Sequence, residues 1–162
     1  MPEGIENPRV IYVPISPGFP DERYASFFAE AVEGGLFDAA VIETYMSGGV
    51  GGMSYQEGVP FHTFGEINMV SRASQHIPTF LVPQAHQEQK YPRRNDGPEL
   101  AGGIALETAY SGVADIVVSK IIEVLKRNRD PQEVIAEVRE YFRQRQWPLP
   151  FRKCREGETW TR

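Results

Sequence analysis

Residues 39–44 read Ala39-Ala40-Val41-Ile42-Glu43-Thr44, an apolar run without the alternation of polar and apolar positions that marks a half-exposed strand. Such runs are typical of strands that are buried on both faces of a parallel sheet. Residues 9–15 and 79–82 have the same character, and prolines at 14 and 83 are placed to end them. We therefore expect three strands in one sheet.

Apolar residues at helical spacing fill the segments between and after these strands. A helix that follows a cap at Asp21 is expected to end at Gly34-Gly35, and a helix over 98–110 is expected to begin with Pro98 in its first turn. Asp130-Pro131 predicts the start of the last helix. The residues expected at helical spacing are Tyr24, Phe27, Phe28 and Ala31; Ile67, Val70, Ser71 and Ser74; Val117, Ile121, Val124 and Leu125; and Val134, Ile135, Val138 and Phe142.

This alternation of strands and helices predicts a three-layer, Rossmann-like α/β domain, with a short, mainly parallel sheet of three to four strands and helices on both faces. The length of 162 residues and mass of 18.3 kDa fit one such domain. We expect it to span residues 1–142, followed by an arm over 143–162. The single cysteine, Cys154, excludes an internal disulfide and every multi-cysteine zinc motif.

Charge is unevenly distributed along the chain. From residue 143 onward there are six basic and two acidic residues, so the arm carries +4 of a total of −5 and the preceding residues carry −9. An acidic body repels phosphate, which argues against nucleic-acid binding by the main domain. The aromatic residues Trp147, Phe151 and Trp160 of the arm favour burial against this subunit or a neighbouring one, and stacking on nucleic-acid bases or covering another partner is the alternative.

Neither a secretory signal nor a long apolar stretch is present in the sequence. We therefore expect a cytoplasmic protein that does not enter a membrane.

Ligands of open α/β sheets bind beyond the carboxyl ends of the strands, so the loops over 16–20, 45–52 and 84–95 are the candidate site. The glycine-rich loop from Tyr45 can turn its amides toward an anion or a carbonyl, and a subunit contact is its alternative role. It matches neither a dinucleotide fingerprint nor a Walker A loop. His86 and Glu88 lack a third ligand, so no metal and no cofactor is expected.

Ser47 is the best-placed hydroxyl for nucleophilic catalysis, because it follows a strand closely. It lacks both a Gly-x-Ser-x-Gly turn and an identifiable base. A small hydrolase that uses Ser47 with His86 remains an alternative interpretation.

The order of several short motifs resembles the C-terminal domain of bacterial-type asparaginases and of the related archaeal amidotransferase subunit that acts on glutamyl-tRNA. The motifs are a Ser-Pro-Gly turn at 16–18, a strand that runs into a glycine loop at 41–50, an Ile-Pro pair and a strand that ends in Gln at 77–84, a lysine-containing helix at 119–125 and Asp-Pro-x-x-Val at 130–134.

The departures from this family concern catalysis. The chain has no Thr-Gly-Gly-Thr segment and lacks the domain that carries the family's threonine nucleophile. Gly49 stands where the resemblance places an asparagine, and the family's acidic contact falls on Asp96 or Glu99. Hydrolysis by this chain alone is therefore not expected, and no catalytic residue is assigned.

The resemblance implies a non-catalytic subunit or assembly part of an amidohydrolase-type system that binds a small amino acid or amide. Its partner would be a second copy or a separate catalytic chain. The alternative is an oligomeric binding or structural module without amide chemistry. The predicted ligand-binding residues are Glu43, Tyr45, Ser47, Gly48, Gly49, Gln84, His86, Asp96 and Glu99.

Overall fold

A computed structural model describes residues 3–14, 22–44, 65–83, 102–106 and 114–144. Within them lies a parallel sheet of four strands in the order β1-β2-β3-β4. The strands are β1 (Val10–Pro14), β2 (Ala39–Thr44), β3 (Thr79–Pro83) and β4 (Ile104–Ala105). The small parallel α/β domain expected from the sequence is thus confirmed.

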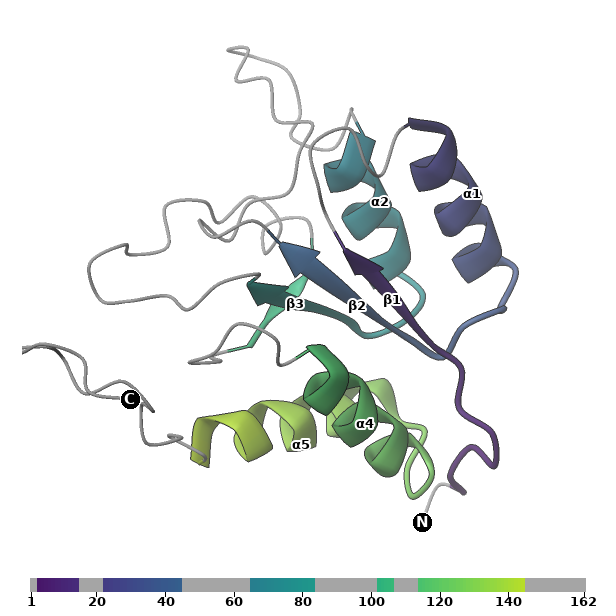
Figure 1. Cartoon of the computed structure of the whole chain (residues 1–162). Coiled ribbons are helices and arrows are strands. Elements are labelled where there is room, and N and C mark those ends of the chain that lie inside the picture. The colour runs from purple at the N-terminus through teal and green to yellow at the C-terminus, as the bar shows by residue number, and fades with distance from the viewer. Residues whose placement is uncertain (1–2, 15–21, 45–64, 84–101, 107–113, 145–162) are drawn as a thin grey trace, which may run out of the picture.

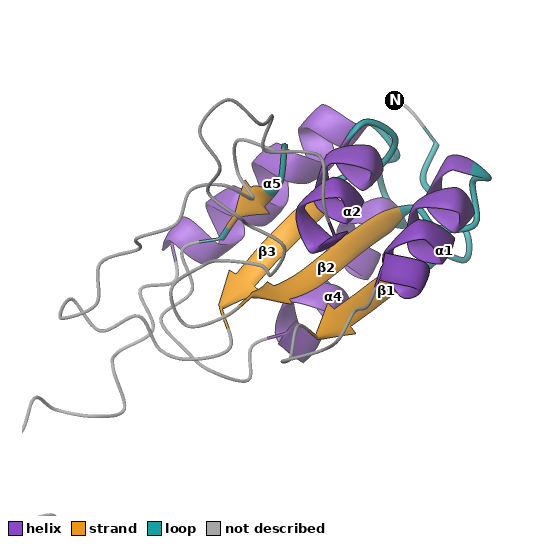
Figure 2. Ribbon diagram, turned by 90° about the horizontal axis from the view of Figure 1, so that it is seen from above, coloured by secondary structure: helices purple, strands orange, loops and turns teal. Residues whose placement is uncertain are grey.

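Helices cover both faces of this sheet (Figure 1). The helices α1 (Glu22–Glu33) and α2 (Gly65–Ser74) lie on one face, whereas α4 (Ala114–Leu125) and α5 (Pro131–Gln144) lie on the other. Seen from above, α2 lies over the sheet and α1 lies toward the β1 edge (Figure 2). This arrangement gives the three layers that the alternation of elements predicts.

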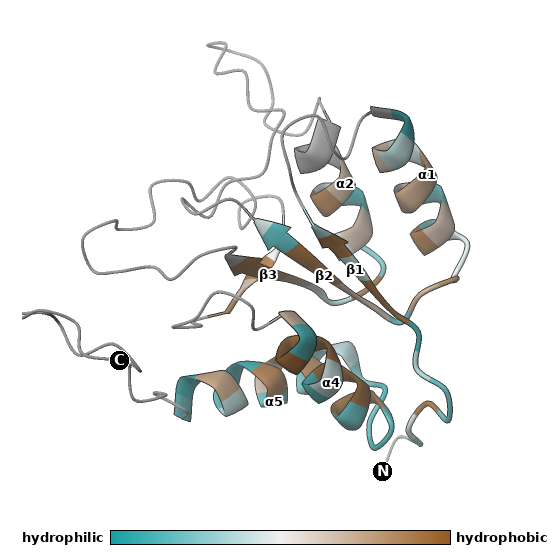
Figure 3. Cartoon of the chain, in the orientation of Figure 1, coloured by the Kyte–Doolittle hydropathy of each residue, from teal (hydrophilic) through white to brown (hydrophobic). Residues whose placement is uncertain are grey.

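Each face of the sheet has its own apolar core, and hydrophobic, brown segments occur in the strands and in the helices of both faces in Figure 3. The first core packs α1 and α2 on one side of the sheet, and the second packs α4 and α5 on the other. The residues in the first include Val13, Phe28, Val32, Ala40, Ile42, Met69, Val70 and Leu81. The residues in the second include Val41, Phe80, Val82, Val117, Ile121, Val124, Val134, Val138 and Phe142.

The central strand β2 confirms the expectation of burial on both faces, because Ala39, Ala40, Val41 and Ile42 have no exposed surface. The same expectation for β1 is wrong. This strand is at the edge of the sheet, and of its five residues only Val13 is buried. An edge strand has a neighbour on one side only, so its apolar run is less covered.

The predicted helix over 98–110 is wrong in its described part, residues 102–106. Ile104 and Ala105 form β4 and are the register partners of Phe80 and Leu81. Gly102 has a φ of +93°, a backbone conformation that interrupts a helix and that glycine adopts without strain.

The apolar side of α1 also differs from the expected one. Ala25, Phe28, Ala29 and Val32 are buried, whereas Phe27 is 65 % exposed. Ala25 and Ala29 are small and buried, which allows α1 and α2 to pack closely against each other, and this orientation turns Phe27 outward. The predicted start of α5 is confirmed, because Asp130 Oδ1 accepts hydrogen bonds from the amides of Gln132 (2.9 Å) and Glu133 (3.1 Å).

Candidate functional site

The candidate site begins with Glu43, at the carboxyl end of β2. Glu43 is the register partner of Pro14 in β1 and of Val82 in β3. Side chains alternate along a strand, so Glu43 shares its side of the sheet with Val41, which packs in the α4/α5 core. Four residues of buried strand thus hold a carboxylate at the end of the sheet where ligands of this fold class bind.

Tyr12 of β1 completes this arrangement. It is the register partner of Val41, which places it on the same side of the sheet as Glu43. The Tyr12 hydroxyl donates a hydrogen bond to Oε2 of Glu43, and the ring is 39 % exposed. The phenol therefore orients the carboxylate at the carboxyl end of the sheet.

The surroundings of Tyr12 keep its hydroxyl protonated. Partial burial raises the pKa of Tyr12 first, and the hydrogen bond to Glu43 and the negative charges of Glu43 and Asp115 raise it further. Each of these effects disfavours a phenolate. Tyr12 can therefore act as a hydrogen-bond donor at neutral pH, not as a base.

Asp115 adds a second carboxylate to this end of the molecule. It lies in the first turn of α4, where the helix dipole stabilises negative charge. The two carboxylates near the Tyr12 ring suit a small ligand that carries a cationic or N–H donor group.

Thr44, the last residue of β2, has a different role. Its side chain is buried, and Oγ1 donates to the Val82 carbonyl at 3.5 Å. Thr44 and Pro83 are register partners, so the chain leaves β2 and β3 at adjacent points. The predicted ligand loops that start at Tyr45 and Gln84 follow these two strand ends directly.

Of the nine ligand-binding residues predicted from the sequence, the structure describes Glu43. The other eight lie outside the described residues, namely Tyr45, Ser47, Gly48, Gly49, Gln84, His86, Asp96 and Glu99. Sequence reasoning missed Tyr12 and Asp115. A tyrosine at an alternate position of an apolar strand was the available signal for Tyr12, but its partner is 31 residues away.

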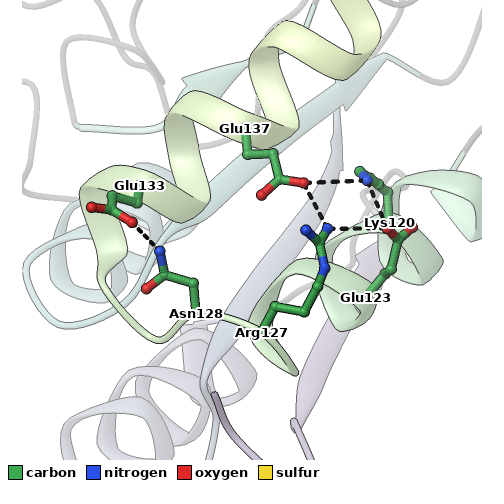
Figure 4. A network of polar contacts seen from close by, with 6 residues as sticks. All are labelled: Lys120, Glu123, Arg127, Asn128, Glu133 and Glu137. Carbon is green, nitrogen blue, oxygen red and sulfur yellow. Dashed lines mark hydrogen bonds and ion pairs between the residues drawn. The ribbon is translucent and has the colours of Figure 1, made fainter. Parts of the chain in front are cut away.

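A second group of charged residues joins α4 to α5 (Figure 4). Lys120 is 9 % exposed; its Nζ lies 3.0 Å from Glu123 Oε1, 3.5 Å from Glu137 Oε1 and 4.7 Å from the centre of the Tyr141 ring. Arg127 bonds the same two carboxylates at 3.0 and 2.7 Å. These charges compensate one another, so the cluster acts as a connection between helices and not as a reactive centre.

Two kinds of feature are absent from the described residues. In the ranges that the structure describes, no three or more His, Cys, Asp or Glu side chains are grouped as metal ligands would be. No helix among these described elements has the length and apolar character required to cross a membrane.

A scan with protein-family models, a search of curated proteins and a search of solved structures gave no match to this chain. The class that the fold defines is a small α/β domain with a four-stranded parallel sheet.

Proposed function

We propose that this protein is a non-catalytic, asparaginase-like domain that binds a small amino acid or amide at the carboxyl end of its sheet. The observation that carries the proposal is the pairing of Tyr12 with Glu43 at that end, beside Asp115 in the first turn of α4. Carboxylates accept hydrogen bonds from an ammonium group or an amide N–H, and such bonds to charged groups are the strong ones.

The resemblance to the asparaginase C-terminal domain supports the choice of ligand. It implies that the loop after the second strand contributes to a site for a small amino acid or amide, and Glu43 immediately precedes that loop. In this proposal Glu43 and Asp115 bind the amino or amide end of the ligand, and the loops beginning at Tyr45 and Gln84 supply the remaining contacts.

The proposal excludes turnover by this chain alone. Thr44, the described hydroxyl nearest to Glu43 in the sequence, is buried and donates to a main-chain carbonyl. An activated nucleophile requires an adjacent base or a lowered pKa. A separate catalytic chain would have to supply the nucleophile.

Isothermal titration calorimetry with L-asparagine, L-aspartate and L-glutamine tests the binding. We expect the unmodified protein to bind at least one of them, and Glu43→Gln to weaken binding roughly tenfold or more, since one charged hydrogen-bond acceptor is lost. Tyr12→Phe should weaken it less, because the carboxylate remains but is no longer oriented. Glu6→Gln, which neutralises an exposed glutamate of the N-terminal segment, is the matched control and should bind normally.

Ammonia release from the same amides tests the absence of turnover. The proposal predicts none from the purified chain. Release that disappears in Ser47→Ala would contradict it and favour the hydrolase alternative. An oligomer that binds none of the three ligands would favour the structural module.

A further inference from the structure

The outward side of α1 carries an unusual residue for a helix surface. Phe27 is 65 % exposed, the largest exposed fraction among the large apolar side chains in the described ranges. The opposite side of the same helix, with Phe28 and Val32, is fully used by the core. Within the described residues, no other side chain of this copy therefore covers most of the Phe27 surface.

The end of α1 adds a second apolar residue to this surface. The Leu36 amide donates to the Ala31 carbonyl and the Gly35 amide donates to the Val32 carbonyl, both at 2.9 Å, with Gly35 at a φ of +72°. These two bonds define a Schellman motif, which brings the residue after the glycine back beside the last helical turn. Leu36 is 48 % exposed. Its amide bonds the carbonyl of Ala31, and Ala31 lies one helical turn after Phe27.

Opposite charges flank Phe27 on the same side of the helix. Arg23 is four residues before Phe27 and Glu30 is three residues after it, and both are exposed. Within the described part of the chain neither forms an ion pair: Arg72 bonds Glu33 at 2.8 Å through each of two nitrogens, and Glu30 acts on Arg72 only through its charge. We call Arg23, Phe27, Glu30, Ala31 and Leu36 the α1 outer face.

We propose that the α1 outer face is a self-complementary interface that joins two copies of this chain about a two-fold axis, with the two α1 helices antiparallel. In a two-fold interface both copies use the same surface. A residue that precedes the axis position in one copy therefore contacts a residue that follows it in the other. With Phe27 at the axis, Arg23 approaches Glu30 of the partner subunit, and Glu30 approaches the partner's Arg23. Phe27 and Leu36 supply the apolar centre.

The charge pattern distinguishes a second copy from other occupants. The chain has a net charge of −5, so two copies repel one another unless the contact itself is complementary. An antiparallel α1 pair provides two opposite-charge contacts and opposes the two helix dipoles. This interface is independent of ligand binding at the carboxyl end of the sheet, so the failure of one proposal leaves the other intact.

Sedimentation velocity of the full chain over a concentration series tests the interface. We expect a species with twice the mass of 18.3 kDa, and Phe27→Asp should remove it. Arg139→Glu, a charge reversal on an exposed position of α5, is the control and should leave the dimer unchanged. Circular dichroism melting of each variant establishes that its monomer is folded.

A charge exchange gives the more specific test. Arg23→Glu and Glu30→Arg should each weaken the dimer, by roughly threefold or more in the dissociation constant, because each places like charges across the axis. The double variant should restore association, since the opposite charges meet again with their positions reversed. A protein that stays monomeric, a dimer that survives Phe27→Asp, or a double variant that is no tighter than the single ones would overturn the proposal.

Discussion

On the α1/α2 face of the sheet, the small residues Ala25, Ala29 and Ala73 are buried among larger side chains, so the two helix backbones can approach each other closely. On the α4/α5 face, branched and aromatic side chains fill the core, and a polar cluster around the buried Lys120 joins the two helices. The two faces also differ in connectivity. α1 and α2 each lie in sequence between two strands, whereas α4 and α5 follow the last described strand.

The two faces of the sheet carry different candidate functions. The α4/α5 side carries the paired Tyr12 and Glu43 with Asp115 near them, and therefore the candidate ligand site. The α1/α2 side carries the exposed Phe27 and Leu36, and therefore the candidate interface. Binding and assembly would then use opposite faces of one sheet.

Truncation of a core aromatic residue on each face should cause the largest loss in the free energy of unfolding. Phe28→Ala is expected to lower the free energy of unfolding by roughly 3–5 kcal/mol, because Phe28 is 1 % exposed in the middle of α1. Phe142→Ala should cost less, since Phe142 lies in the last turn of α5, where helix ends fray. Urea unfolding measures both. A larger cost at Phe142 would show that α5 stabilises the domain more than α1 does.

Removal of the polar contacts that join α4 to α5 should cause the next largest loss in the free energy of unfolding. Lys120→Ala is expected to cost about 1–3 kcal/mol, because the buried aliphatic part of the side chain is lost together with its two ion pairs. Arg72→Met, which removes the exposed pair between α2 and α1, should shift the urea midpoint less. Equal shifts would contradict the distinction between the two faces.

Substitutions at one helix end on each side of the sheet should cause smaller losses of stability. Asp130→Ala removes the cap of α5 and should cost about 1 kcal/mol. Gly35→Ala forces a side chain into the positive φ at the end of α1 and should cost about 1 kcal/mol or more. Thermal melting measures both, with Gly34→Ala as a neighbouring control at negative φ. A neutral Gly35 variant would contradict the role of the Schellman motif.

Lowering the pH should slightly reduce the stability that ion pairs on both sides of the sheet contribute. Hydrogen bonds from Arg72 to Glu33 and from Lys120 to Glu123 lower the pKa of each carboxyl from its ordinary value of 4.5. A carboxyl with a lowered pKa in the folded state stabilises the fold above pH 4.5, and this contribution disappears as the pH falls through the lowered value. Urea midpoints between pH 7 and pH 3 should fall less in Glu33→Gln and Glu123→Gln. Unchanged pH profiles would contradict the pairing.

Local patterns predicted a large part of this fold. The β-branched runs located β1, β2 and β3, and Asp130-Pro131 located the start of α5, because these signals depend on neighbouring residues only. The helix expected over 98–110 was wrong at Ile104, whose strand conformation depends on pairing with Phe80. The expectation that Phe27 lies on the buried side of α1 was wrong, because tertiary packing of α1 determines which of its sides is buried.

The candidate site stays a prediction. Glu43 was named among its residues from the resemblance to the asparaginase C-terminal domain, and it lies near the end of the buried strand β2. Its partner Tyr12 was not identified, since the pair depends on the register of β1 against β2.

The sequence by itself determined the alternation of strands and helices and the parallel class of the sheet, since hydrophobic periodicity and turn residues act over a few positions. Tertiary structure alone decided the strand order, the pairing of Tyr12 with Glu43, the burial of Lys120 and the exposure of Phe27. The physical reason is that parallel pairing joins residues 24 to 39 positions apart, and no local pattern specifies which distant segment becomes a neighbour.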